Sequence, residues 1–388
     1  MMKKIQLLNK IAACGTDVFD KNIYEVAEDI ESPDAIMVRS ASMHEMTFNP
    51  ELLAIARAGA GVNNIPLDKC SEEGIVVFNT PGANANGVKE LAIAALILAA
   101  RDVVGGIEWA KTLAGNPDAA KAVEKGKGAY VGNELAGKTL GVIGLGAIGG
   151  MVANTAVHLG MKVIGCDPFL SVNAAWNLSR SIEKGASFDE VFQKADYITL
   201  HVPATKDTKG MISEKTISMM KDGVRIINLA RADLVNADDI KEALANGKVA
   251  SYVTDFPTPD TIGVKGIVNI PHLGASTYES EDNCAIMAAH ELDEFLTCGN
   301  IKNSVNMPCV AIPHTGAERV CLIHKNVPTI LGQITGIVAK HNVNIENMAN
   351  GSRGEYGYTI VELGEALPAS TDAEFKAIDG MIRVTYYN

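Results

Sequence analysis

Short apolar runs alternate with longer segments of mixed polarity through the first three quarters of the chain. Runs of this length are typical of buried strands, and the segments between them are long enough to form helices. Strands that alternate with helices build a parallel sheet, because parallel neighbours need a crossover connection. We therefore expect an α/β, doubly wound parallel sheet over residues 91–290, with strands at 139–143, 161–166, 197–201, 224–228, 251–254 and 267–270.

The two ends of the chain carry different patterns. A second, smaller α/β domain is expected over residues 1–90, which have apolar runs at 35–38, 53–58 and 75–78. Polar residues and prolines between 303 and 316 predict a linker. The pattern from 317 to 388 predicts a ferredoxin-like unit of order βαββαβ. Its expected elements are strands at 319–324, 344–349, 357–363 and 381–386, helices at 329–341 and 372–378, and a hairpin turn at 351–354.

Residues 139–167 contain a strand, a glycine-rich turn, a small-residue helix, a second strand and an acid, in that order. Gly144, Gly146 and Gly149 have G-x-G-x-x-G spacing, which provides a tight turn, a path for a pyrophosphate and close packing of the helix on the sheet. Asp167 can accept hydrogen bonds from ribose hydroxyls, and its charge would repel the 2′-phosphate of NADP. We expect NAD as the cofactor; the alternative is an ordinary glycine turn in an α/β sheet.

Composition and charge limit the class of partner. With 388 residues, of which 47% are hydrophobic and 21% charged, the chain can bury a sizeable core. A net charge of −12 argues against nucleic acid or an anionic membrane as the main partner. The longest apolar stretch, 91–100, is too short to cross a bilayer. Seven scattered cysteines without C-x-x-C spacing favour a reducing cytoplasm and argue against a metal site.

Three charged residues follow expected strands at their carboxyl ends, where ligands bind in open α/β sheets. These are Arg231, Asp260 and His272. An imidazole can take the hydroxyl proton while hydride leaves an alcohol carbon, and a guanidinium can polarise the forming carbonyl. An acid beside the imidazole would orient it and stabilise its protonated form. Taken singly, each could be an ordinary surface or turn residue, but together on a dinucleotide fold they predict a dehydrogenase.

Four motifs, GLGAIG, HVPATKDTKG, NLARADLV and PHLGAST, resemble those of the D-isomer-specific 2-hydroxyacid dehydrogenases, and the likeness spans about residues 30–305. The resemblance implies that His272 is the base, Arg231 the carboxylate and carbonyl clamp, and Asp260 the helper. It groups residues 291–308 with the N-terminal substrate domain. The implied cofactor-binding residues are Gly144, Gly146, Ala147, Ile148, Gly149, Asp167, His201, Pro203, Ala230, Asp255 and Gly274. The implied substrate-binding residues are Arg39, Ser40, Gly61 and Asn84.

The supporting acid departs from the family pattern. The family usually has L-D-V-F-x-x-E, whose Glu supports the His, and this chain has T-D-F-P-T-P-D. Counting from Asp255 puts Asp260 at the position of the Glu, whereas aligning Phe-Pro-Thr puts Pro259 there. We take Asp260, because the role requires a carboxylate. In the first motif, Ala147 replaces an Arg that is usual in the family.

The tail resembles an ACT domain. By that resemblance His324, Asn326 and Asn344 would bind L-serine as an effector. Thr329 replaces a Gly that usually lets the effector approach the helix N-terminus. Edge strands of such a unit pair readily between subunits, which predicts a homo-oligomer whose tail contributes an interface.

The resemblance implies NAD-dependent oxidation of a phosphorylated 2-hydroxy acid, with 3-phosphoglycerate as the expected substrate. Another 2-hydroxy acid, such as 4-phosphoerythronate or a non-phosphorylated acid, is the nearest alternative. A non-catalytic, NAD-sensing interaction protein on the same fold is an alternative of a different class. The retained Arg231, Asp260 and His272 argue against that second alternative.

Overall fold

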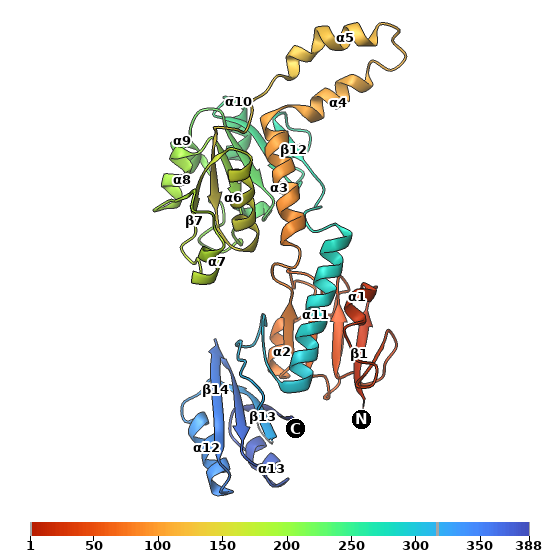
Figure 1. Cartoon of the computed structure of the whole chain (residues 1–388), viewed down its shortest axis with the longest axis vertical. Helices are drawn as coiled ribbons and strands as arrows, with labels where there is room; N and C mark the ends of the chain where they lie inside the picture. The colour runs from red at the N-terminus through yellow and green to blue at the C-terminus, as the bar shows by residue number, and fades with distance from the viewer. Residues whose placement is uncertain (1, 316–317, 388) are drawn as a thin grey trace. The chain divides into compact units, whose positions relative to one another are not determined.

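The computed structural model describes residues 2–315 and 318–387. The chain forms two compact units, and Figure 1 labels many of the helices and some of the strands of both. We call Ala85–Ser280 the central unit, and Met1–Asn84 together with Glu281–Asn388 the terminal unit. Each unit is described by itself below.

The central unit is built on a seven-stranded parallel sheet of order β12-β11-β10-β9-β6-β7-β8. The order runs outward in both directions from β6 and β9, so the carboxyl ends of these two strands flank the switch point where such sheets bind ligands. The strands are β6 Thr139–Ile143, β7 Lys162–Cys166, β8 Ile182–Lys184, β9 Tyr197–Leu200, β10 Val224–Asn228, β11 Val249–Thr254 and β12 Ile267–Asn269.

Helices cover both faces of this sheet, as its doubly apolar strands require. Leu140 and Val142 of β6 pack on one face in a buried cluster with Ala92 of α3, whereas Ile143 packs on the other face with Phe192 of α8. The helices are α3 Ala85–Ala100, α4 Val103–Lys111, α5 Ala119–Gly126, α6 Ala147–His158, α7 Val172–Trp176, α8 Phe188–Lys194, α9 Glu214–Met219 and α10 Ala237–Ala245. The 3-10 turns are η1 Lys127–Tyr130 and η2 Ala232–Leu234.

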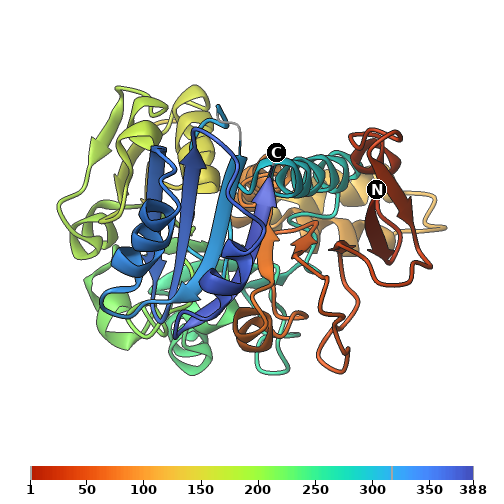
Figure 2. The ribbon, with the colours of Figure 1, turned by 90° about the horizontal axis from the view of Figure 1, so that it is seen from below.

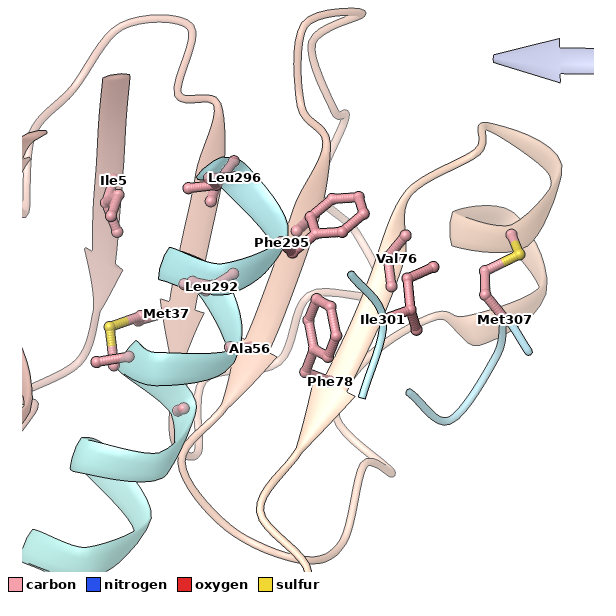
Figure 3. Packing of buried hydrophobic residues seen from close by; sticks show 14 of the residues in the cluster. Ile5, Met37, Ala56, Val76, Phe78, Leu292, Phe295, Leu296, Ile301 and Met307 are labelled. Carbon is pink, nitrogen blue, oxygen red and sulfur yellow. The ribbon is translucent and has the colours of Figure 1, made fainter. Parts of the chain in front are cut away.

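The first part of the terminal unit is a five-stranded parallel sheet of order β2-β1-β3-β4-β5. Its main cover is α11 (Tyr278–Cys298), whose apolar side packs on the sheet around Leu292 and Leu296. Figure 3 shows this core, in which the rings of Phe78 and Phe295 lie 5.6 Å apart. The other elements are β1 Lys3–Leu8, β2 Tyr24–Ala27, β3 Ala35–Val38, β4 Ala54–Arg57, β5 Val76–Asn79, α1 Ala13–Thr16 and α2 Leu67–Glu72.

The tail folds as an antiparallel sheet of order β14-β15-β13-β16 with two helices on one face (Figure 2). Alternate residues of β13 face opposite sides, so Leu322 packs under the helices and Ile323 joins the core around α11. The elements are β13 Glu318–Lys325, α12 Ile330–Lys340, β14 Ile345–Arg353, β15 Tyr356–Leu363, α13 Thr371–Lys376 and β16 Met381–Tyr387.

The doubly wound fold and the βαββαβ order are confirmed. Strands β1, β2 and β8 were not predicted, and two further details differ from expectation. The hairpin turn is at Gly354 and Glu355 rather than at 351–354, because β14 pairs with β15 as far as Arg353. Residues 303–316 include a packed segment, since the Asn306 side chain bonds the backbone of Ile75 and Val77. The compact units divide after residues 84 and 280, the expected domain limits at 90, 290 and 308 stay predictions, and the limit expected at 317 lies outside the described residues.

Candidate active site

The glycine-rich turn leaves an open path at its centre. Gly144 has φ +88°, a conformation that favours glycine, and a Cβ on Gly149 would overlap the carbonyl oxygen of Gly144. A Cβ on Gly146, in contrast, would meet nothing within 4 Å. Packing within the chain therefore explains the outer two glycines, and the middle one leaves room beside the N-terminus of α6. This arrangement fits a pyrophosphate, with Ala147 and Ile148 in the first helical turn.

Asp167 is fixed directly after β7. Its Oδ2 accepts a hydrogen bond from the Leu145 backbone N at 2.9 Å, and its Oδ1 accepts one from the Phe169 N at 2.9 Å. The side chain lines a cavity of about 560 Å³ together with Leu145, Leu170 and Leu178. A carboxylate at the edge of an apolar cavity suits an adenosine, whose base can enter the cavity while its ribose hydroxyls bond the acid.

Two of the other expected cofactor residues follow β9. The Nε2 of His201 is hydrogen-bonded to the Thr199 hydroxyl at 2.9 Å, and burial lowers the pKa of His201 to about 4. This imidazole is therefore neutral near pH 7 and adds no positive charge to the site. The carbonyl oxygen of Pro203 accepts a hydrogen bond from the Thr208 hydroxyl, which shapes the loop after the strand.

Asn228, the last residue of β10, holds the loop that carries Arg231. Its buried amide donates to the Arg231 carbonyl oxygen at 2.8 Å, and its Oδ1 accepts from the backbone N of Ala230 at 3.2 Å and of Arg231 at 3.3 Å. The amide also donates to the Tyr252 hydroxyl at 3.2 Å. We did not single out Asn228 from the sequence, although a polar residue at the end of a buried strand was a signal for it.

Arg231 and His272 meet at the ring of Phe256. The ring centroids of Phe256 and His272 are 4.6 Å apart with 45° between the planes, and the guanidinium carbon of Arg231 lies 6.0 Å from the Phe256 centroid. The structure thus brings together two of the three residues predicted to be catalytic. Phe256 was not predicted to be part of the site, although it lies in the T-D-F-P-T-P-D segment that was compared with the family pattern.

Asp255 is the acid that interacts with this group. The side chain is only 1% exposed, and burial raises the pKa of its carboxyl, while the charges of His272 and Arg231 and a hydrogen bond from the Gly274 backbone oppose the rise. Its Oδ1 has no hydrogen-bond partner within the described residues. An acid in this position can stabilise a protonated imidazole and can accept a hydrogen bond from a ligand.

Asp260 has a different environment. It is exposed and lines a cavity of about 320 Å³ with Asp233 and Tyr252, and its charge acts on Lys241. In the part of the chain that the structure describes, no hydrogen bond or ion pair joins Asp260 to His272. Its role as the helper of His272 therefore stays a prediction.

Two arginines lie together in the terminal unit. The Arg57 Nε donates to the Arg39 carbonyl oxygen at 3.1 Å, and burial together with the charge of Arg39 lowers the pKa of Arg57. The Arg39 guanidinium pairs with Glu281 at 2.5 Å. Arg57 was not predicted from the sequence. It is the last residue of strand β4 and so, like Arg231 after β10, it lies at the carboxyl end of a strand.

Two of the other expected substrate residues, Gly61 and Ser40, lie near this pair. Gly61 is beside Arg57, whose Nη1 would be 3.9 Å from a Cβ at that position. The backbone N of Ser40 donates to Asn9 Oδ1 at 3.1 Å. Asn84 is partly exposed and immediately precedes α3.

The three expected effector residues are not gathered within one chain. His324 is buried and bonded at both ring nitrogens, to the Lys325 carbonyl oxygen and the Thr359 hydroxyl. It stands opposite Gly357 at one end of β15, whereas the Asn344 backbone bonds Gly364 at the other end. The Asn326 side chain donates to the Gly354 carbonyl oxygen at 3.3 Å, at the His324 end.

The described residues contain neither a cluster of metal ligands nor a membrane-spanning helix. Residues 2–315 and 318–387 contain no group of three or more His, Cys, Asp or Glu side chains that could hold a metal ion. The seven cysteines are free thiols. Over the same ranges, no helix combines the length and the apolar character needed to cross a bilayer.

The chain is similar in sequence to a known family and to several named proteins. Residues 94–274 match the family model described as D-isomer specific 2-hydroxyacid dehydrogenase, NAD binding domain. The chain is 35% identical over 309 residues to D-3-phosphoglycerate dehydrogenase of Bacillus subtilis, with 76% of this chain and 55% of that protein covered. It is 30% identical over 401 residues to D-3-phosphoglycerate dehydrogenase 1 of Saccharomyces cerevisiae, with 93% of this chain and 81% of that protein covered.

A solved structure is similar as well. It is the cofactor (NAD+)-bound 3-phosphoglycerate dehydrogenase of Entamoeba histolytica, with a TM-score of 0.60, 27% identity, and 79% of this chain and 99% of that chain covered. The chain spans about half the length of the Bacillus relative, at 55%. The match over 94–274 and the yeast relative show that this chain belongs to the D-isomer specific 2-hydroxyacid dehydrogenase family and that its central unit holds the NAD-binding domain.

Proposed function

We propose that this protein oxidises the 2-hydroxyl of 3-phosphoglycerate to give 3-phosphohydroxypyruvate, the first step of L-serine biosynthesis, with bound NAD supplying the hydride acceptor. The observation that carries the proposal is the meeting of Arg231 and His272 at Phe256, in the unit that binds NAD. The names of the relatives in Bacillus and yeast support this substrate.

His272 takes the proton of the substrate hydroxyl through its imidazole, since a neutral imidazole is a suitable base near pH 7. Arg231 binds the substrate carboxylate and polarises the carbonyl oxygen that forms beside it. Asp255 offsets the positive charge that His272 acquires, and it is the acid with an electrostatic interaction with that ring. Asp260 is the second candidate for this support, as the sequence predicts.

Arg39 and Arg57 provide the charge that a phosphorylated substrate requires. The chain has a net charge of −12, so an anionic substrate needs a local group of cations. The two arginines are at the carboxyl ends of the neighbouring strands β3 and β4, and they lie close enough for the charge of one to lower the pKa of the other. An anion between them would relieve that repulsion, and guanidinium groups bind phosphate through two parallel hydrogen bonds.

The proposal includes a homo-oligomer and, through the tail, inhibition by L-serine. The helices α4 and α5 contain no buried residue, and Val104, Ile107 and Val123 are exposed on them, which favours contact with a second copy. His324 and Asn344 lie at opposite ends of β15, so a serine that touched both would have to bridge two chains. Mass measurement in solution and an assay at millimolar serine, with the full chain and with a variant that ends at residue 315, test both parts.

NADH production with a panel of acids tests the main proposal. We expect turnover with 3-phosphoglycerate to exceed that with D-glycerate, D-lactate and 4-phosphoerythronate. His272→Ala should lower turnover at least about a hundredfold and leave NAD binding little changed. Preference for another acid would correct the substrate, and absence of turnover with every acid would favour a non-catalytic, NAD-sensing protein.

A further inference from the structure

The ring of Phe256 contacts both groups to which the proposed reaction assigns a role. It lies against the imidazole of His272 on one side and within cation–π distance of the Arg231 guanidinium. We infer that Phe256 is a positioning residue, which orients the base and the clamp together and stabilises the imidazolium that His272 forms. The inference rests on the proposed function, and it adds a residue that neither the motifs nor the relatives assign.

The backbone of Phe256 and the Arg231 side chain are both held by hydrogen bonds, the latter through its Nη1, which donates to the Ala230 carbonyl oxygen at 2.7 Å. The Phe256 N donates to the Thr254 hydroxyl at 3.1 Å, and both Thr254 and Asp255 are buried. The His272 side chain is exposed, and within the described residues its ring nitrogens make no hydrogen bond. The ring contact with Phe256, with 45° between the planes, is therefore an interaction that can restrain the plane of the imidazole.

The chemistry of the aromatic face suits both partners. The face of a phenyl ring carries partial negative charge, so it attracts a guanidinium at all times and an imidazolium once the proton has moved. Arg231 alone would disfavour a second cation nearby. An aromatic ring close to both groups offsets part of that repulsion at the moment when His272 becomes charged.

A purely structural role is the competing explanation. Phe256 also lines the cavity of about 320 Å³ that contains Ile240, Tyr252 and Asp260, so its replacement could simply disturb packing. Ile240 is fully buried in the same cavity wall, within the apolar cluster that contains Leu234 and Tyr252. Ile240→Val is therefore the matched control for a packing effect.

The experiment compares Phe256→Leu, Phe256→Tyr and Ile240→Val in the full chain. Leu keeps an apolar side chain of similar size and removes the aromatic face, and Tyr keeps the face. For Phe256→Leu we expect kcat to fall about tenfold and the acidic limb of kcat/KM against pH to move about half a unit lower. The direction follows because a less stable imidazolium loses its proton at lower pH. Phe256→Tyr and Ile240→Val should keep the wild-type profile.

A histidine NMR titration separates this inference from the proposed function. The His272 signal is identified by its loss in His272→Gln, and its midpoint should fall in Phe256→Leu even if the wild-type protein oxidises none of the acids. Unchanged midpoints and pH profiles in Phe256→Leu would overturn the inference, as would equal losses in Phe256→Tyr or Ile240→Val. Thermal melting of each variant shows whether it is folded. If Phe256→Leu does not fold, a changed pH profile in Phe256→Tyr would still overturn the inference.

Discussion

Two aspartates follow β11, and their surroundings differ sharply. Asp255 is buried and interacts electrostatically with His272 and Arg231, whereas Asp260 is exposed and acts on Lys241. A carboxylate affects an imidazole most strongly when both are close and shielded from water. The structure therefore favours Asp255 as the acid that stabilises protonated His272.

Replacing each aspartate by asparagine distinguishes their roles. Loss of a nearby carboxylate makes the imidazolium less stable, so the acidic limb of kcat/KM against pH moves to lower pH. We expect this movement to be larger in Asp255→Asn than in Asp260→Asn. The profiles are measured with 3-phosphoglycerate at saturating NAD. A larger movement in Asp260→Asn would restore the sequence prediction and would imply that the 251–260 segment rearranges in the reacting enzyme.

Arg57 provides a second prediction at this scale. If its guanidinium binds the substrate phosphate, Arg57→Gln should raise KM for 3-phosphoglycerate by about tenfold with little change in kcat, because a bond made equally in ground and transition states is lost. KM for D-glycerate, which has no phosphate, should not change. Arg180→Gln, at an exposed site in the central unit, is the control. Equal effects on the two substrates would remove Arg57 from the phosphate site.

The helix α11 contains an acid where an apolar helix face would be expected. Glu291 is 7% exposed, its Oε1 accepts a hydrogen bond from Asn303 at 2.7 Å, and its Oε2 has no partner among the described residues. Burial raises the pKa of Glu291 to about 8. The folded chain thus holds a proton here that the unfolded chain releases from about pH 4.5 upward.

This shift predicts a pH-dependent loss of stability. Because the folded state binds the extra proton, the contribution of Glu291 is complete below about pH 4.5 and is lost as pH rises through about 8. Glu291→Gln keeps an acceptor for Asn303 and removes the ionisation. The advantage in melting temperature of this variant over wild type should therefore grow from about pH 5 to about pH 8. Glu279→Gln, at an exposed site on the same helix, should show no such trend.

At the scale of the terminal unit, a buried ion pair joins the tail to the end of α11. Arg319 and Glu362 are both fully buried and paired. The Arg319 guanidinium also donates to the carbonyl oxygens of Cys298 at 2.5 Å and Ile312 at 3.0 Å, and to Asn300 Oδ1 at 3.1 Å. The guanidinium thereby caps the C-terminus of α11 and anchors the segment that leads into the tail.

Removing one partner of this pair should be far worse than removing both. Arg319→Met removes the arginine charge from buried Glu362, whose Oε2 still has the His314 ring at 3.3 Å, and should cost about 3–5 kcal/mol of unfolding free energy. The double variant Arg319→Met with Glu362→Leu should recover much of that loss, because two apolar side chains replace two charges. Denaturant unfolding measures both. Lys376→Ala, which breaks an exposed pair with Asp372, should cost less than about 1 kcal/mol. Equal losses in the single and double variants would show that the contacts to Cys298 and Ile312 dominate.

The sequence by itself determined most of the strands of the sheets and the cofactor motif. Strand and helix positions follow from hydrophobic periodicity, and the turn at Gly144–Gly149 follows from conformations open to glycine, so both are set by residues close together in the chain. The same local patterns identified Arg231 and His272 as residues that follow strands. They could not rank Asp255 against Asp260, because both follow β11 within a few residues.

Only the tertiary structure decided which side chains meet. The meeting of Arg231, Phe256 and His272 depends on β10, β11 and β12 being neighbours and on the path of each loop after its strand. Arg57 approaches Arg39 for the same reason, across β3 and β4. Arg319 reaches the end of α11 because the free face of the tail sheet packs there. Each contact joins segments brought together by strand order and packing, which no pattern along a single segment encodes.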